Sequence, residues 1–139
     1  MKKLLIFTII LFTCWANCSA QVHTAAQAPA TVYIIRSTGF IASMVNFSVV
    51  INDLIYCKLG NKRYSILELK PGVQTLYIVD WASPKPKQRY GLNMYLEAGK
   101  TYYLQMVMKE KLIGTPSLYF EQIPYNIAMP LIAKCKLQD

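Results

Sequence analysis

The stretch NFSVVINDLIYCKL, residues 46–59, combines two apolar runs with a short polar turn between them. Apolar and more polar positions alternate in the first run, and its apolar set is Phe47, Val49 and Ile51. A period of two residues places one set on the core face of a β-strand and the other set toward solvent. Asn52 and Asp53 both tolerate positive φ, so they suit a two-residue hairpin turn. The stretch therefore predicts a β-hairpin with one buried face.

Runs of the same kind recur along the chain, separated by Gly, Pro, Asn and Asp. Such punctuation is typical of strands rather than helices. The predicted strands are Thr31–Arg36, Asn46–Ile51, Leu54–Leu59, Tyr64–Leu69, Val73–Trp81, Tyr90–Glu97, Thr101–Lys109 and Ser117–Gln122. Because no long helical segment separates them, we predict an all-β domain, an antiparallel β-sandwich of about seven to eight strands. A small β-barrel is the architectural alternative.

The connections agree with strands. Pro71-Gly72 suits the middle of a type II turn, and residues 82–89, ASPKPKQR, predict an exposed loop. The C-terminal stretch leaves two alternatives open. Pro130 opens a short helix through Lys134, or the segment lies extended along a sheet edge.

The first residues, MKKLLIFTIILFTCWANCSAQ, have the composition of a secretion signal. Lys2 and Lys3 precede the apolar run Leu4–Phe12, and a small-residue site predicts cleavage between Ala20 and Gln21. The apolar run is shorter than the roughly 20 residues that a bilayer-spanning helix needs. We therefore predict a signal peptide at residues 1–20, a flexible lead-in at 21–29 and a single domain at 30–139.

Export favours the periplasm or the outer-membrane surface as the location, and the mature chain has no predicted transmembrane span. Cys18 raises the alternative of a lipid anchor. Bacterial lipid-attachment signals carry Leu or a similar residue three positions before the cysteine and a small residue directly before it, but here Trp15 and Asn17 stand there. Soluble export is therefore favoured over anchoring.

Two cysteines follow the signal, Cys57 and Cys135. In an oxidising compartment they predict one disulfide, because a single pair allows one intramolecular connectivity. The alternative is two separately buried thiols, which behave as small hydrophobic side chains.

The residues do not predict an enzyme. Gly99-Lys100-Thr101 resembles the end of a phosphate-binding loop, but Met94 occupies the place of its first glycine. The strand-like alternation after Thr101 also contradicts that loop, which must open a helix. We interpret Ala98-Gly99 as a hairpin turn. The single histidine, His23, lies in the lead-in, so no positioned imidazole is expected, and neither a metal site nor a cofactor is predicted.

The charge balance suggests an anionic neighbour. The whole chain carries a net charge of +8, and removal of Lys2 and Lys3 leaves 13 basic against 7 acidic side chains. Lys85, Lys87 and Arg89 alternate with prolines and a glutamine, so an extended loop would project them at regular intervals. For an exported chain, anionic glycan or lipid headgroups are more plausible ligands than nucleic acid. A merely solubilising loop is the alternative.

Four segments together resemble one known family. They are ATVYIIRSTGFIASMVNFSVVIND at 30–53, RYSILELKPGVQTL at 63–76, LEAGKTYYLQM at 96–106 and LIAKCKL at 131–137. Their order and spacing resemble the domain-of-unknown-function family numbered 2846, and the ending Ser-Ala-Gln is similar to export signals from Bacteroidetes. The resemblance implies a small exported envelope β-domain, sometimes lipid-anchored, with no established activity and no catalytic residues. We therefore expect a non-enzymatic structural or protein-interaction module that binds another envelope protein. A binding module for anionic glycan or lipid is the alternative.

Overall fold

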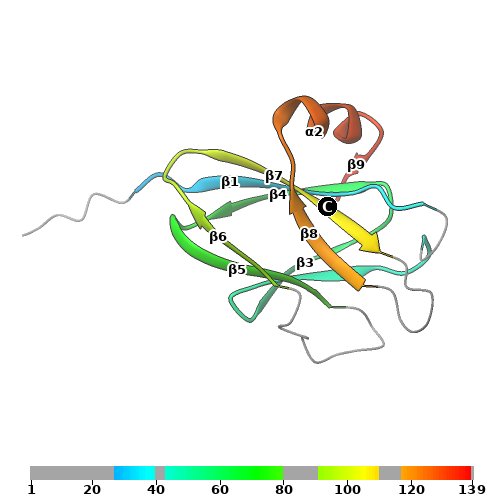
Figure 1. Ribbon diagram of the computed structural model, residues 1–139, viewed down its shortest axis with the longest axis horizontal. Coiled ribbons are helices and arrows are strands. Elements are labelled where there is room, and N and C mark those ends of the chain that lie inside the picture. The colour runs from blue at the N-terminus through cyan, green and yellow to red at the C-terminus, as the bar shows by residue number, and fades with distance from the viewer. Residues whose placement is uncertain (1–26, 40–42, 80–90, 110–116, 139) are drawn as a thin grey trace, which may run out of the picture.

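The computed structural model describes residues 27–39, 43–79, 91–109 and 117–138, and its strands form two sheets packed face to face (Figure 1). The five-stranded sheet contains β1 (Ala30–Arg36), β4 (Arg63–Leu69), β7 (Thr101–Lys109), β8 (Ser117–Gln122) and β9 (Lys136–Leu137). Its strand order is β8-β7-β1-β4-β9. The four-stranded sheet contains β2 (Phe47–Ile51), β3 (Leu54–Leu59), β5 (Gly72–Val79) and β6 (Leu92–Leu96), in the order β3-β2-β5-β6. The predicted all-β fold with a short C-terminal helix is confirmed.

The five-stranded sheet is mixed rather than purely antiparallel. β1 pairs in parallel with β7, and the short β9 pairs in parallel with β4. The remaining pairs in both sheets are antiparallel. Hydrophobic alternation could not distinguish these directions, because a strand shows the same period in either.

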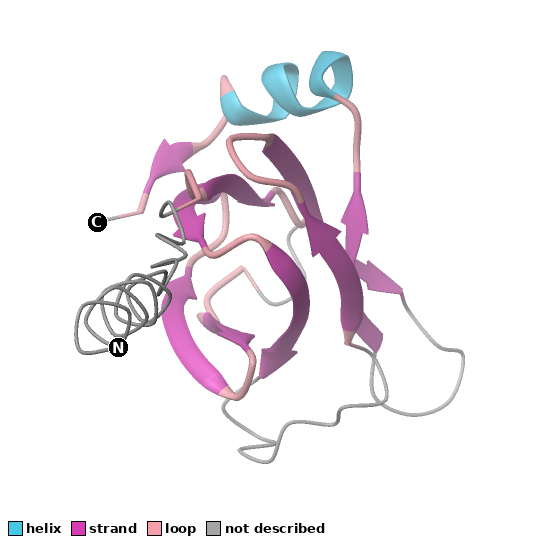
Figure 2. Ribbon diagram, turned by 90° about the vertical axis from the view of Figure 1, so that its left-hand side faces the viewer, coloured by secondary structure: helices cyan, strands magenta, loops and turns pink. Residues whose placement is uncertain are grey.

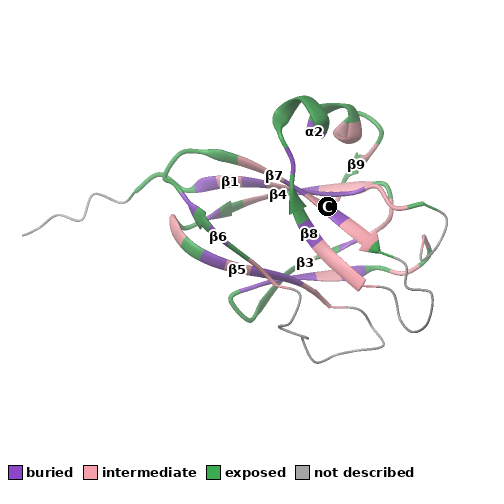
Figure 3. Ribbon diagram, in the orientation of Figure 1, coloured by how far each residue is buried: buried purple, intermediate pink, exposed green. Residues whose placement is uncertain are grey.

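The core lies between the two sheets and follows the predicted alternation (Figure 3). The inward residues of the quoted hairpin, Phe47, Val49 and Ile51, are all buried. The facing sheet contributes Val32 and Ile34 from its central strand. Burial of apolar area of this kind is the main stabilising contribution to a β-sandwich.

A buried arginine joins the two sheets at one end of the core. Arg36 ends β1 and is 0% exposed. Its guanidinium donates hydrogen bonds to the carbonyl oxygens of Leu59, at the end of β3, and of Val45, just before β2. It also lies 4.3 Å from the ring centroid of Phe47 in β2. Burial lowers the pKa of Arg36, although arginine remains charged in proteins. The hydrogen bonds and the aromatic ring offset the cost of burying that charge.

The predicted turns are present, but one of them connects different partners. Asn52 and Asp53 have φ of 47° and 66° and join the antiparallel pair β2 and β3. Gly72, after Pro71, has the positive φ that its turn requires. Gly99 also has positive φ, at 70°, yet β6 and β7 belong to different sheets. The prediction of a hairpin there was wrong, because the turn carries the chain from one sheet to the other.

The C-terminal helix α2 (Tyr125–Ile132) begins earlier than we predicted. Its N-cap is Pro124, and Pro130 lies inside it rather than opening it. Pro130 has no N–H for the carbonyl of Asn126, so the last turn forms with one hydrogen bond fewer. The helix lies over the outer face of the five-stranded sheet (Figure 2). Ala128 packs there with Ile35 and Ile123 in a second, smaller core.

Candidate functional site

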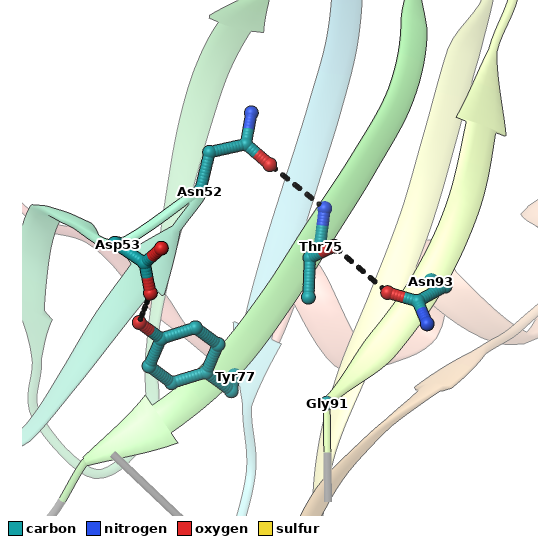
Figure 4. Close-up of a pocket in the computed structure, with 6 residues that line it drawn as sticks. All are labelled: Asn52, Asp53, Thr75, Tyr77, Gly91 and Asn93. Atoms are coloured by element: carbon teal, nitrogen blue, oxygen red, sulfur yellow. Dashed lines mark hydrogen bonds between the residues drawn. The ribbon is translucent and has the colours of Figure 1, made fainter. Parts of the chain in front are cut away.

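A polar pocket of about 400 Å³ opens on the outer face of the four-stranded sheet (Figure 4). The β2–β3 turn, β5 and the start of β6 surround it. Its described lining residues are Asn52, Asp53, Thr75, Tyr77, Gly91 and Asn93. The pocket therefore lies on the side of this sheet that faces away from the sandwich core.

The β2–β3 turn is fastened to β5 on this face. The backbone N–H of Asn52 donates to the carbonyl of Thr75 at 2.9 Å, and the Asn52 side-chain oxygen accepts from the N–H of Thr75 at 3.0 Å. The Asn52 side-chain nitrogen donates to the carbonyl oxygen of the buried Gln74 side chain. Asn at this position thus accepts the positive φ and also holds the turn against the neighbouring strand.

The fastened turn presents Asp53 to Tyr77. The Tyr77 hydroxyl donates to one Asp53 carboxylate oxygen at 2.6 Å. Burial and the hydrogen bond to Asp53 raise the pKa of Tyr77 to about 12. Tyr77 therefore stays protonated at neutral pH and acts as a donor that fixes the carboxylate.

The far wall of the pocket comes from β6. The Thr75 hydroxyl donates to the side-chain oxygen of Asn93 at 2.8 Å, which orients the Asn93 amide. The pairing of Leu76 with Leu92 brings the next β6 position, Gly91, opposite Tyr77. Glycine contributes no side chain there, so the face remains hollow beside the tyrosine ring.

The chemistry of this pocket is that of hydrogen bonding. Among its described lining residues Asp53 alone carries a charge. Within the described ranges, no three His, Cys, Asp or Glu side chains gather as a metal site would require. Its described lining offers a carboxylate, two amides and two hydroxyls, which together bind hydrogen-bond donors and acceptors.

The outer face of the five-stranded sheet carries a second group of side chains, a row of tyrosines. The Tyr33 ring stacks on Tyr103 with 5.1 Å between centroids and more distantly on Tyr64. Tyr125 of α2 meets Tyr103 edge-on at 5.8 Å. These rings flank the helix and stabilise its docking by mutual packing.

The candidate disulfide between Cys57 and Cys135 is absent, and both residues are free thiols. Cys57 lies on β3 and packs against the core between the sheets, whereas Cys135 packs in the smaller core beneath α2. The predicted pairing was wrong because the two residues belong to different layers, which spacing along the chain does not reveal. The Cys135 thiol instead lies 3.8 Å from the carbonyl oxygen of Arg36.

Burial raises the pKa of both thiols. For Cys57 a hydrogen bond with Ser65 of the opposite sheet partly offsets that effect, and for Cys135 the charge of Lys62 does so. Both side chains therefore remain in the protonated, weakly reactive form at neutral pH.

The other predicted site residues lie outside the described residues. They are the basic loop residues Lys85, Lys87 and Arg89 and the cleavage-site residues Ala20 and Gln21. Both stay predictions. Two further basic residues, Lys62 and Arg63, lie at the turn into β4, where the Arg63 side chain donates to the carbonyl of Leu137 at 3.3 Å.

The segment that resembled a phosphate loop is a turn. The N–H of Lys100 donates to the carbonyl of Glu97 at 3.3 Å, and the two side chains form an ion pair at 2.7 Å. Thr101 begins β7 rather than a helix. The predicted strand after the turn is confirmed.

Sequence reasoning did not find the polar pocket. The sequence predicted Asp53 only as a turn residue and Tyr77 only as part of the strand Val73–Trp81. The sequence does hold one signal for this pocket, the alternation along its strands. That alternation places Thr75, Tyr77 and Asn93 on the outward side. Recognising the site would also have required the pairing of β2 with β5 and of β5 with β6.

No family model matches the chain, and no curated protein is significantly similar to it. The resemblance to family 2846 therefore stays a prediction. Across the part of the chain that the structure describes, no helix has the length and apolar character needed to cross a membrane.

Proposed function

We propose that this chain is an exported, non-enzymatic β-domain of the bacterial envelope that binds a partner protein by strand addition at β3. The observation that carries the proposal is the side-chain exposure along this edge strand. Leu54 and Ile55 are 65% and 68% exposed, and Tyr56 follows them at 47%. Three consecutive exposed apolar residues on an edge strand are a surface that pairs readily with another chain.

A β-bulge explains how this apolar edge arises. Val49 pairs with Cys57 and Val50 with Ile55, so Tyr56 is an extra residue in β3. The extra residue shifts the alternation and moves Ile55 to the outer face, beside Val50. A regular strand would have kept position 55 on the core face with Cys57.

The other described edges are less suited to strand addition. β9 has two residues, and β8 packs against β5 and β6 of the other sheet. β6 presents five residues, but its outer face borders the polar pocket. By contrast, β3 has six residues and a single charged side chain, Lys58. Charged residues usually protect exposed edges, so their scarcity on β3 supports a partner there.

The export and the location at the envelope are proposed from the signal at residues 1–20 and from the family resemblance. The non-enzymatic character is also proposed from the family resemblance. A partner that adds a strand would form main-chain hydrogen bonds and cover the apolar side chains of β3.

The experiment compares two variants of the mature chain in affinity purification from native envelopes. Ile55→Lys places a charge on the β3 edge, and Ile66→Lys places the same charge on an exposed position of an inner strand, β4. We expect one protein to co-purify with the wild type and with Ile66→Lys, insensitively to salt, and to be lost with Ile55→Lys. Retention of that protein by Ile55→Lys would refute strand addition at β3. Salt-sensitive retention that disappears on charge reversal of Lys85, Lys87 and Arg89 would support the anionic-ligand alternative instead.

A further inference from the structure

We propose that the polar pocket is a binding site for a neutral saccharide, with Asp53 and Asn93 as the hydroxyl-binding groups and Tyr95 as a stacking surface. The site lies on the outer face of the four-stranded sheet, next to the β3 edge that carries the proposed function, but it rests on hydrogen-bonding groups rather than on the exposed edge.

Two hydrogen-bonding groups of the pocket have no partner among the described residues and are available to sugar hydroxyls. One Asp53 carboxylate oxygen accepts from Tyr77, and the other has no hydrogen-bond partner among the described residues. The Asn93 oxygen accepts from Thr75, which leaves its NH₂ group without a described partner (Figure 4). A carboxylate accepts and an amide donates, so the two walls of the pocket offer complementary groups to hydroxyls at different positions of a saccharide.

The two groups are held in place before a ligand arrives. Tyr77 and the fastened turn fix Asp53, and Thr75 fixes the plane of the Asn93 amide. A ligand therefore orders few protein side chains on binding, which lowers the entropic cost.

The charge of the described lining selects against acidic sugars. Asp53 is its one charged side chain, and it would repel a carboxylate or phosphate placed beside it. The remaining described groups are amides and hydroxyls, which suit uncharged hydroxyl-rich ligands. A neutral saccharide is the class that fits both observations.

An exposed aromatic ring continues the site along β6. Tyr95 follows Asn93 by two residues on the same face and is 66% exposed. Its cross-strand neighbour Val73 is 70% exposed, so the two form a small apolar surface next to the polar pocket. The C–H face of a sugar ring packs on such a surface while its hydroxyls bind the polar groups. Two residues of strand span about 7 Å, so a disaccharide rather than one ring would contact both parts.

The experiment is an NMR titration of the isotope-labelled mature chain with the neutral disaccharides cellobiose, maltose and lactose. We expect at least one to shift the backbone amides of Asp53, Thr75, Asn93 and Tyr95 in a saturable way. Asp53→Asn tolerates the positive φ and still accepts from Tyr77, and it should weaken binding about tenfold by removing the charged acceptor.

A matched pair of tyrosine variants tests the stacking surface. Tyr95→Ala should also weaken binding about tenfold. Tyr125→Ala removes an equally exposed ring from α2, on the other sheet, and should leave binding unchanged. Equal loss in both variants would overturn the role of Tyr95.

Three outcomes would overturn the proposal as a whole. They are the absence of shifts at the pocket with all three sugars, binding that Asp53→Asn leaves unchanged, and binding of galacturonic acid oligomers without binding of any neutral sugar. None of these depends on a partner protein, because the titration contains only the purified chain and the sugar, whereas strand addition is read out by co-purification. Failure of the saccharide site is therefore distinguishable from failure of strand addition.

Discussion

The two outer faces of this sandwich differ in what covers them. On the five-stranded sheet, α2 lies over the outer face (Figure 2). Beneath it Ile35 packs with Ala128 and with the rings of Tyr64 and Tyr103, so that face has a small core of its own. On the four-stranded sheet, apolar residues such as Val73 and Tyr95 stay exposed beside a polar pocket. A face covered by its own helix contributes to stability, whereas exposed apolar side chains next to hydrogen-bonding groups mark a surface for binding. The covered face therefore contributes to stability, and the other face carries the proposed binding site.

The largest expected effect is on the covered face. Ile35 is fully buried beneath α2, so Ile35→Ala should lower the free energy of unfolding by about 3 kcal/mol. Tyr95→Ala, on the open face, should change it by less than about 0.5 kcal/mol. Urea unfolding of the mature chain measures both. Similar losses in the two variants would break the division between a stabilising face and a binding face.

A smaller effect concerns Tyr77, which is buried although it lies on the open face. Its pKa is raised to about 12 from an ordinary value of 10. The folded state binds this proton more tightly than the unfolded state does, so its contribution is complete below pH 10 and is lost as the pH rises toward 12. Tyr77→Phe should cost about 1 kcal/mol at neutral pH and should make the alkaline decline shallower. Unfolding free energies measured across this range test the claim, and identical slopes in the two proteins would contradict it.

The smallest effect separates the two thiols by how fast each one reacts. Cys135 lies in the core beneath α2, and Cys57 lies against the core between the sheets. Both should react slowly with a thiol reagent at neutral pH, because burial raises their pKa. Ile35→Ala should accelerate labelling of Cys135 more than labelling of Cys57, since local opening of the helix exposes only the former. Mass spectrometry of the labelled chain resolves the two sites, and denatured, unreduced mature protein should show two reactive thiols. Fewer than two would indicate a bridge after all.

Much of the fold follows from the sequence because the alternation that marks a strand is visible within a few neighbouring residues. The alternation of Phe47, Val49 and Ile51 predicted their burial, and Asn52-Asp53 predicted a turn of positive φ. The sequence did not reveal which strands pair with one another. The Gly99 turn fits either a hairpin or a crossing between sheets, and the local residues are the same in both cases.

The site was harder to predict than the fold because long-range pairing assembles it. Asp53 and Tyr77 are 24 positions apart and meet only when β2 pairs with β5. The bulge at Tyr56 had no sequence signal that we recognised, and it changes which side of β3 faces out. The prediction of a disulfide failed for a related reason, since spacing along the chain does not specify the layer in which each thiol lies.

The parallel pairing of β1 with β7 also determines the order in which the molecule can assemble. β1 is the first strand among the described residues, yet it lies at the centre of its sheet between β4 and β7. Its neighbours begin at residues 63 and 101, so both contacts close long loops and form slowly. A chain that emerges from its N-terminus first holds its central strand unpaired until most of its length is available. If the chain is exported as proposed, such late closure would delay folding until most of the chain has crossed the membrane.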